Sequence, residues 1–139
     1  DIGTVVTGKT PATANAKYYN GPYMFISPTE LHGEYKVERS EKTITQKGLE
    51  SIKSNSIDGT SVLVGCIGWD MGNVSMCFEK CATNQQINSI TKIKNSYNPY
   101  YLYYWLSTKK KEQHRFHRRT FLVRIGSKVR VFLRGRTCF

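Results

Sequence analysis

The stretch SVLVGCIGWDMGNVSMCFE, residues 61–79, decides the fold of this chain. Its first part, residues 61–68, is a β-branched apolar run, which predicts a central strand. Residues 73–79 alternate between two faces, which predicts a second strand. Val74, Met76 and Phe78 share one face, and Ser75, Cys77 and Glu79 share the other. Residues 70–73 contain aspartate, glycine and asparagine and form the turn between the two strands.

Further elements follow from local patterns on both sides of this stretch. Residues 22–27 predict a short buried strand that Pro28 ends, and residues 86–93 alternate as a strand. Residues 45–54 predict a short helix with Thr45 as its N-cap, an apolar side at Leu49 and Ile52, and a weak point at Gly48. Together these elements predict an α+β fold, a single domain with a twisted, mainly antiparallel β-sheet and a few helices.

Residues 98–111, NPYYLYYWLSTKKK, predict the strongest helix. Asn98 is a good N-cap, and Pro99 suits the first helical position. One face combines Leu102, Trp105 and Leu106 with Tyr101 or Tyr103 at its margin. We expect the aromatic residues of this helix to pack in the core.

The net charge of +11 describes the end of the chain and not its body. Residues 1–108 carry ten Lys/Arg and nine Asp/Glu, whereas residues 109–139 carry eleven Lys/Arg and one Glu. A strongly basic segment favours a polyanionic partner, but the nearly neutral body argues against an electrostatic funnel over the whole surface. No run approaches the length of a transmembrane helix, and residues 1–10 lack the pattern of a signal peptide.

The cysteines, at 66, 77, 81 and 138, do not form a dense disulfide framework, which favours an intracellular, cytoplasmic protein. A zinc site from Cys77, Cys81, His114 and His117 has unsuitable spacing, so we expect no metal. No cysteine lies in a recognisable nucleophile turn, and buried cysteine behaves as a small apolar side chain. Residues 6–11, VTGKTP, lack the first glycine of a P-loop. The sequence therefore predicts no catalytic residue.

A binding function fits better, because asparagine and glutamine can pair with adenine in the major groove and lysine or threonine can contact phosphates. The run TNQQ, residues 83–86, precedes a strand, where polar amides are commonly turn residues. Two hypotheses for Asn84 and Gln85 stay open. These side chains either contact bases or brace the turn and hold Gly68 and Gly72 in place.

Five segments in order resemble the target recognition domain of type I restriction-modification specificity subunits. They cover about 100 of the 139 residues: a Gly-x-Thr-Pro opening and a strand into Ser-Pro (8–31), ITQKGLE (44–50), SVLVGCIGWDMGNVSM (61–76), TNQQINSI (83–90) and YLYYWL (101–106). The resemblance implies sequence-specific binding to one half of a bipartite double-stranded DNA target, without catalysis by this chain. It also implies methyltransferase and restriction subunits as partners, which carry S-adenosylmethionine, ATP and Mg²⁺; we expect no cofactor in this chain and no membrane partner.

The chain departs from the family after Lys111. The family continues toward a long spacer helix that binds the methyltransferase subunits, whereas residues 112–139 are rich in arginine. We therefore divide the chain into a recognition domain, residues 1–111, and a basic tail or hairpin, residues 112–139. Two explanations stay open for the second part: a truncated or frameshifted sequence, or a genuine terminal hairpin with a turn at Gly126 and Ser127.

The predicted DNA-contacting residues lie in two regions. The first is the opening segment, and the second surrounds the central strands. The predicted residues are Lys9, Thr10, Tyr18, Tyr19, Trp69, Asn73, Asn84 and Gln85. An alternative is a nonspecific nucleic-acid or protein interaction module driven by the tail, in which Arg124, Arg130 and Arg134 hold phosphates. A nuclease that uses Asp70 is a distant third hypothesis.

Overall fold

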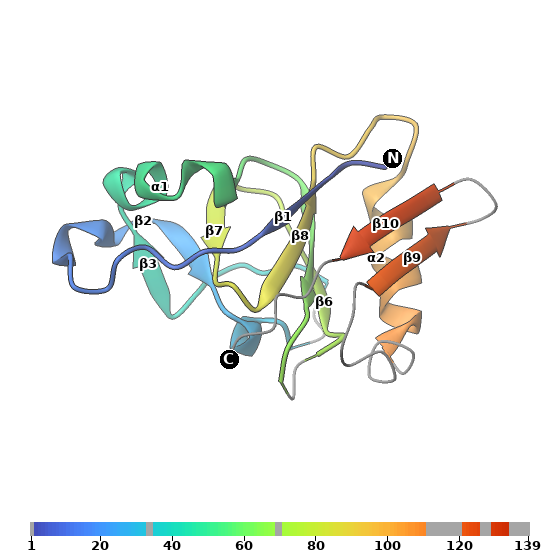
Figure 1. The fold of residues 1–139 in the computed structure, drawn as a ribbon, viewed down its shortest axis with the longest axis horizontal. Helices are drawn as coiled ribbons and strands as arrows, with labels where there is room; N and C mark the ends of the chain where they lie inside the picture. Colours follow the sequence, from blue (N-terminus) through green and yellow to red (C-terminus); the bar gives the residue numbers. More distant parts are fainter. Residues whose placement is uncertain (1, 33–34, 69–70, 111–120, 126–128, 134–139) are drawn as a thin grey trace.

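A computed structural model describes residues 2–32, 35–68, 71–110, 121–125 and 129–133. Within them the chain forms two four-stranded sheets and a separate two-stranded hairpin (Figure 1). The first sheet is antiparallel, in the order β1 (Thr4–Thr7), β8 (Ile87–Thr91), β5 (Ser61–Gly65) and β6 (Val74–Cys77). The second has the order β3 (Lys42–Ile44), β2 (Tyr19–Ile26), β7 (Cys81–Thr83) and β4 (Ser56–Ile57).

One strand pair departs from the antiparallel pattern. β2 and β7 run parallel, while β2–β3 and β4–β7 are antiparallel. The predicted α+β class with mainly antiparallel strands is therefore confirmed, although the strands divide between two sheets.

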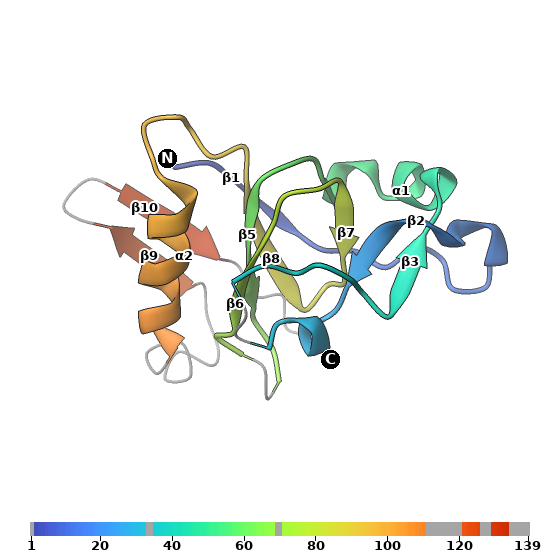
Figure 2. The same ribbon diagram turned by 180° about the vertical axis from the view of Figure 1, so that it is seen from behind.

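The two sheets pack face to face between two helices (Figure 2). α2 (Pro99–Thr108) covers the outer face of the first sheet, and α1 (Gln46–Ser51) covers the outer face of the second. Between the sheets lies an apolar cluster to which both contribute, with Ile26 and Cys81 from one sheet and Leu63 and Ile87 from the other. Three apolar layers therefore separate four layers of secondary structure.

The strand–turn–strand predicted from residues 61–79 is β5 followed by β6. Val74 and Met76 pack under α2, whereas Cys77 on the opposite face packs between the sheets, which confirms the predicted alternation. Both faces are buried, however, and even Ser75 is only 1% exposed. Alternating hydrophobicity normally indicates one solvated face, so the burial of the second face depends on the second sheet.

The two predicted helices begin at their predicted caps. The hydroxyl of Thr45 accepts from the Gly48 N–H at 3.2 Å, and the Asn98 carboxamide accepts from Tyr100 N–H at 2.9 Å. α1 ends at Ser51 and is followed by the short 3₁₀ helix η3 (Lys53–Asn55). Two more such turns, η1 (Ala16–Tyr18) and η2 (Pro28–Glu30), precede and follow β2.

The aromatic residues of α2 are less buried than predicted. Leu102, Tyr103 and Leu106 face the core, so Tyr103 and not Tyr101 joins the apolar face. Three other tyrosines are exposed because they lie on the opposite side of the helix. They are Tyr100, Tyr101 and Tyr104.

Replacing Gly48 by alanine is expected to destabilise the protein. Alanine normally favours a helix over glycine by about 1 kcal/mol. Here a Cβ would lie 2.4 Å from the carbonyl oxygen of Tyr18, and overpacking of this kind costs about 1–3 kcal/mol. Thermal unfolding followed by circular dichroism should show a lower Tm for Gly48→Ala, whereas Lys47→Ala at an exposed position of α1 should leave it nearly unchanged. A stabilised Gly48→Ala variant would contradict this account.

Candidate nucleic-acid interface

Three separate loops meet where β1 and β5 end and β8 begins. They are residues 8–11, residues 66–73 (described except 69–70) and residues 84–86. We call these described residues the loop edge. Their backbones are joined by three hydrogen bonds: Gly8 N–H to Ile87 O (3.0 Å), Lys9 N–H to Thr83 O (2.9 Å) and Cys66 N–H to Gln86 O (2.8 Å).

Asn84 is a brace of the 84–86 turn. Its side-chain oxygen accepts from the backbone N–H of Gln86 at 3.0 Å, and its side-chain nitrogen donates to Gln86 Oε1 at 3.2 Å. Its backbone N–H donates to Ile26 O at 3.0 Å, which ties the turn to the end of β2. The Asn84 carboxamide is therefore largely committed to the protein itself.

Gln85 differs from its neighbour, because its side chain is exposed. Its Oε1 accepts from the hydroxyl of Thr10 at 2.8 Å, across 75 residues of sequence. Its Nε2 has no hydrogen-bond partner within the described part of the chain. One end of this amide is thus held in place, and its donor end is free for a ligand.

The predicted brace of Gly68 and Gly72 is not formed by these amides. Gly72 has a φ of 82°, a backbone conformation that glycine adopts readily, and its N–H donates to Gly65 O at 2.8 Å. The N–H of Met71 donates to Gly68 O at 3.2 Å. Backbone hydrogen bonds therefore shape the 66–73 loop.

The opening segment brings further predicted residues to the loop edge. Lys9 is exposed and Thr10 is half-buried. The hydroxyl of Tyr19 donates to Pro11 O at 2.7 Å, and burial raises the pKa of Tyr19. Tyr18 lies farther along, where its carbonyl accepts from the Thr45 N–H at 2.9 Å at the start of α1. Lys9, Thr10 and Gln85 are thus neighbours, while the two tyrosines anchor the segment that leads away.

The other residues that the sequence predicts to contact DNA are Asn73, Trp69 and the arginines of the tail. Asn73 closes the 66–73 loop, and its Oδ1 accepts from Lys110 Nζ at 2.6 Å. Trp69 and Asp70 lie outside the described residues. The predicted hairpin is present as β9 (Phe121–Ile125) and β10 (Val129–Leu133), in a register that sets Arg124 opposite Arg130. Its turn and Arg134 also lie outside the described residues.

The cysteines do not form an active site with described partners. The Cys77 and Cys81 sulfurs lie 3.4 Å apart in the core, and the hydrogen bond that Cys81 shares with Cys77, together with burial, raises the pKa of Cys81. Among the residues that the structure describes, no three potential metal ligands cluster. The zinc hypothesis also involves His114 and His117, which lie outside them.

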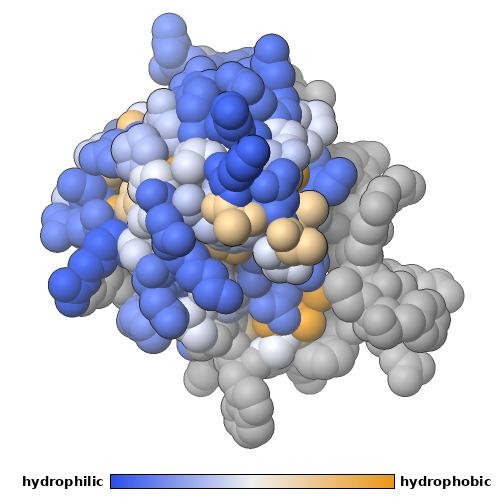
Figure 3. Space-filling model, turned by 90° about the vertical axis from the view of Figure 1, so that its left-hand side faces the viewer, coloured by the Kyte–Doolittle hydropathy of each residue, from blue (hydrophilic) through white to orange (hydrophobic). Residues whose placement is uncertain are grey.

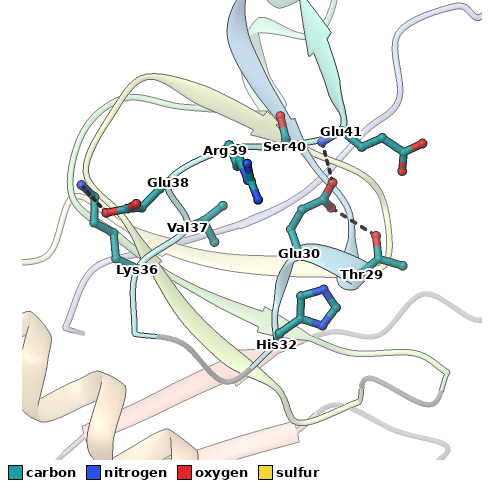
Figure 4. Close-up of a pocket in the computed structure, with 9 residues that line it drawn as sticks. All are labelled: Thr29, Glu30, His32, Lys36, Val37, Glu38, Arg39, Ser40 and Glu41. Atoms are coloured by element: carbon teal, nitrogen blue, oxygen red, sulfur yellow. Dashed lines mark hydrogen bonds and ion pairs between the residues drawn. The ribbon is translucent and has the colours of Figure 1, made fainter.

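A hollow of about 660 Å³ lies beside η2 and residues 36–41 (Figure 4). Burial opposes ionisation of Glu30, but hydrogen bonds from Ser27, Glu41 and Thr29 outweigh it and hold the pKa of Glu30 below its usual value. Around the hollow, basic and acidic side chains alternate; they include His32, Lys36, Arg39, Glu38 and Glu41. This mixture of charges suits a polyanion less well than the loop edge does.

The end of the molecule formed by η1, β3 and α1 is mainly hydrophilic, with only small apolar islands (Figure 3). Lys17 on η1 and Lys47 on α1 are exposed there and form no ion pair with any described residue. Among all the residues that the structure describes, no helix is long and apolar enough to cross a membrane. This end of the molecule thus carries two exposed lysines that have no ion-pair partner among the described residues.

Sequence reasoning missed three polar residues under the loop edge. They are Thr7, Asn55 and Asn88. The Asn55 side chain donates to the Thr7 carbonyl, the Thr7 hydroxyl donates to Asn88, and the Asn88 side chain donates to the sulfur of Cys66. The one available signal was Asn88, a carboxamide within the otherwise strand-like run 87–91.

Comparisons with known proteins agree on one family. A family model described as the type I restriction modification DNA specificity domain matches residues 1–128. The chain is 32% identical over 90 residues to the type I restriction enzyme HindI specificity subunit of Haemophilus influenzae, covering 65% of this chain and 19% of that protein. It is 31% identical over 111 residues to the MjaIX specificity subunit of Methanocaldococcus jannaschii, covering 78% of this chain and 25% of that protein.

The fold is similar to that of a solved specificity subunit. The crystal structure of the HsdS subunit from Thermoanaerobacter tengcongensis matches with a TM-score of 0.64 at 13% identity, over 95% of this chain and 31% of that one. Both curated relatives are specificity subunits, in agreement with the prediction that this chain is not itself an enzyme. The family predicted from the sequence is confirmed: the chain belongs to the type I restriction modification DNA specificity domains.

Proposed function

We propose that this chain binds double-stranded DNA sequence-specifically through the loop edge and recognises one half of a bipartite target. The observation that carries the proposal is the exposed Gln85 amide, which is held by Thr10. Lys9, which precedes Thr10, is also exposed and forms no ion pair with a described residue. A glutamine amide can recognise the major-groove edge of adenine, and lysine can contact the phosphates that set the register. Because Thr10 holds Gln85 before DNA arrives, little side-chain freedom is lost on binding.

The remainder of the proposal concerns the complex. The chain spans 19% and 25% of the two curated relatives, so the functions of the whole protein need the rest of such a subunit. We expect methyltransferase subunits, which methylate adenine N6 with S-adenosylmethionine, and a restriction subunit to join when a spacer helix is supplied. In this proposal residues 1–111 form the DNA recognition domain, and residues 112–139 form a separate basic tail or hairpin that does not supply the spacer helix.

Replacing Gln85 by alanine is expected to reduce discrimination between DNA sequences by about tenfold to hundredfold, because one bidentate base contact contributes about 1–3 kcal/mol. The full chain should first select its preferred site from a duplex pool with a randomised centre. Binding to that site and to random duplex is then compared. Gln46→Ala is the matched control, since Gln46 is an exposed amide on α1 away from the loop edge. Unchanged discrimination by Gln85→Ala together with a lowered Tm would assign Gln85 a structural role.

A second candidate is nonspecific binding driven by the basic tail. It is supported by the strand register, which sets Arg124 opposite Arg130. Replacing both arginines by glutamine would weaken binding to all duplexes equally if they contact phosphates. If the wild-type chain selects no sequence and this double variant loses all binding, the tail hypothesis replaces the first proposal.

A further inference from the structure

Directly beneath the loop edge lies a buried carboxamide, Asn88, on β8. Its side chain is only 1% exposed, and the strand register sets it between Thr7 on β1 and Val64 on β5. Its Oδ1 accepts from the Thr7 hydroxyl at 2.8 Å, and its Nδ2 donates to the sulfur of Cys66 at 3.1 Å. Both ends of the carboxamide are therefore engaged, each by a different segment.

Burial of a carboxamide is unfavourable unless hydrogen bonds replace its contacts with water. Two neighbours on the same strand, Ser89 and Thr91, also bury hydroxyl groups, and these have no partner among the described residues. Asn88 differs from them because its hydrogen bonds connect β8 with β1 and with the residue that follows β5. We call the two side-chain hydrogen bonds of Asn88, to Thr7 and to Cys66, the bridge. The bridge ties neighbouring segments together, which the hydroxyl groups of Ser89 and Thr91 do not do among the described residues.

Each partner of Asn88 leads directly into the loop edge. Thr7 is followed by Gly8 and Lys9, and its carbonyl also accepts from Asn55 Nδ2 at 2.9 Å. Cys66 begins the 66–73 loop; its thiol donates to Val64 O at 3.3 Å and its backbone N–H to Gln86 O. Asn88 itself follows the 84–86 turn after one residue. One side chain therefore joins the bases of all three loops.

The electrostatic surroundings of Cys66 fit a structural role for its thiol. Burial raises the pKa of Cys66, although the hydrogen bonds with Asn88 oppose this rise. The neutral thiol is both a weak acceptor from Asn88 and a weak donor to Val64. Cys66 thus acts as one end of the bridge and not as a nucleophile.

We propose that Asn88 is a positioning residue for DNA recognition. It does not touch DNA, but it sets the spacing of Lys9 and Thr10, of Cys66 at the start of the 66–73 loop, and of Gln85. The expected effect of Asn88 on DNA discrimination rests on the proposed function, whereas the effect of Asn88 on the loops can be measured without DNA. Disturbing one bidentate base contact costs about tenfold to hundredfold in discrimination, so a loosened bridge should appear as lost discrimination.

The first measurement uses the full chain without DNA. Asn88→Ala should increase hydrogen exchange at the amides of Lys9, Cys66 and Gly8, which lie in the segments that the bridge joins. Ser89→Ala is the matched control, because it removes a buried polar group from the same strand that makes no bond to a loop. Thr7→Val removes one end of the bridge at nearly constant volume and is used if Asn88→Ala does not fold. Exchange that is unchanged in a folded bridge variant overturns the inference, whatever the DNA result.

The second measurement is discrimination between the selected duplex and random duplex, well below the Tm of each variant. We expect a loss of about tenfold or more for Asn88→Ala and little change for Ser89→Ala. Cys66→Ser, which keeps an acceptor, should retain discrimination better than Cys66→Ala. If Asn88→Ala discriminates as well as the wild type, the inference fails and the proposed function stands. If the wild-type chain shows no preference, the proposed function fails, and the exchange result alone decides whether Asn88 positions the loops.

Discussion

Gly8→Ala is expected to displace the opening segment and to remove both folding stability and DNA discrimination. A Cβ at this position would lie 2.0 Å from Asn84 O, 2.3 Å from Thr83 Oγ1 and 2.5 Å from Thr83 O. Two of these atoms belong to the backbone, and Thr83 is fully buried, so none can move away cheaply. The clash between this Cβ and the atoms of Thr83 and Asn84 is relieved only if residues 8–10 separate from the 84–86 turn.

That separation would break the hydrogen bonds from Gly8 N–H and Lys9 N–H and the contact between Thr10 and Gln85. Overpacking costs about 1–3 kcal/mol, and each lost hydrogen bond adds about 1 kcal/mol. We therefore expect a loss of at least about 3 kcal/mol in the free energy of unfolding. Denaturant unfolding measures the loss of folding stability. Binding to the selected duplex and to random duplex measures the loss of DNA discrimination.

The matched control for Gly8→Ala is Gly68→Ala, also at the loop edge. A Cβ at Gly68 meets no atom within 4 Å, but its φ of 84° disfavours alanine by about 1–2 kcal/mol. The control thus introduces backbone strain without pushing two segments apart. If Gly8→Ala unfolds at the same denaturant concentration as the wild type, the close packing of the opening segment against the turn is wrong.

Leu63→Ala is expected to destabilise the protein by about 2–5 kcal/mol, the usual range for removing a buried leucine side chain. Leu63 is fully buried in the cluster between the two sheets, where it packs with residues of both. The cavity would lie in the middle of the molecule, and the backbone of the central strand β5 leaves it little room to collapse. Equilibrium unfolding in urea measures the loss.

Leu63→Met is the control for this substitution, because it nearly conserves volume and should cost less than about 1.5 kcal/mol. Equal losses for the two variants would contradict tight packing between the sheets. Discrimination between DNA duplexes by folded Leu63→Ala should change less than in Gly8→Ala, since the apolar Leu63 side chain packs between the two sheets and takes no part in the hydrogen bonds of the loop edge.

The elements that the sequence predicted correctly depend on local signals. The caps Thr45 and Asn98 and the apolar run of β5 each act within a few residues, so their patterns are visible without a partner. β1, β4 and β7 were missed because each has only two to four residues. Their stability comes from neighbouring strands: β1 from β8, over eighty residues away, β4 from β7, and β7 from both β2 and β4.

The different roles of Asn84 and Gln85 also could not be predicted from local sequence signals. Both are amides in one polar run, and composition alone leaves each as a base contact or a brace. The structure commits Asn84 to Gln86 within the turn, while Gln85 is exposed and held from outside by Thr10. DNA contact by Gln85, Lys9 and Thr10 stays a prediction.

By itself, the sequence determined the family, the α+β class and the strand–turn–strand around residues 61–79, because these depend on local pattern and on the order of segments. The tertiary structure alone decided that both faces of that strand pair are buried and that residues 8–11, 66–73 and 84–86 share an edge. It also assigned Asn88 to bridge Thr7 and Cys66. Two of the hydrogen bonds at this edge join Thr7 to Asn88, 81 positions apart, and Thr10 to Gln85, 75 positions apart. No short-range pattern in a chain encodes such contacts.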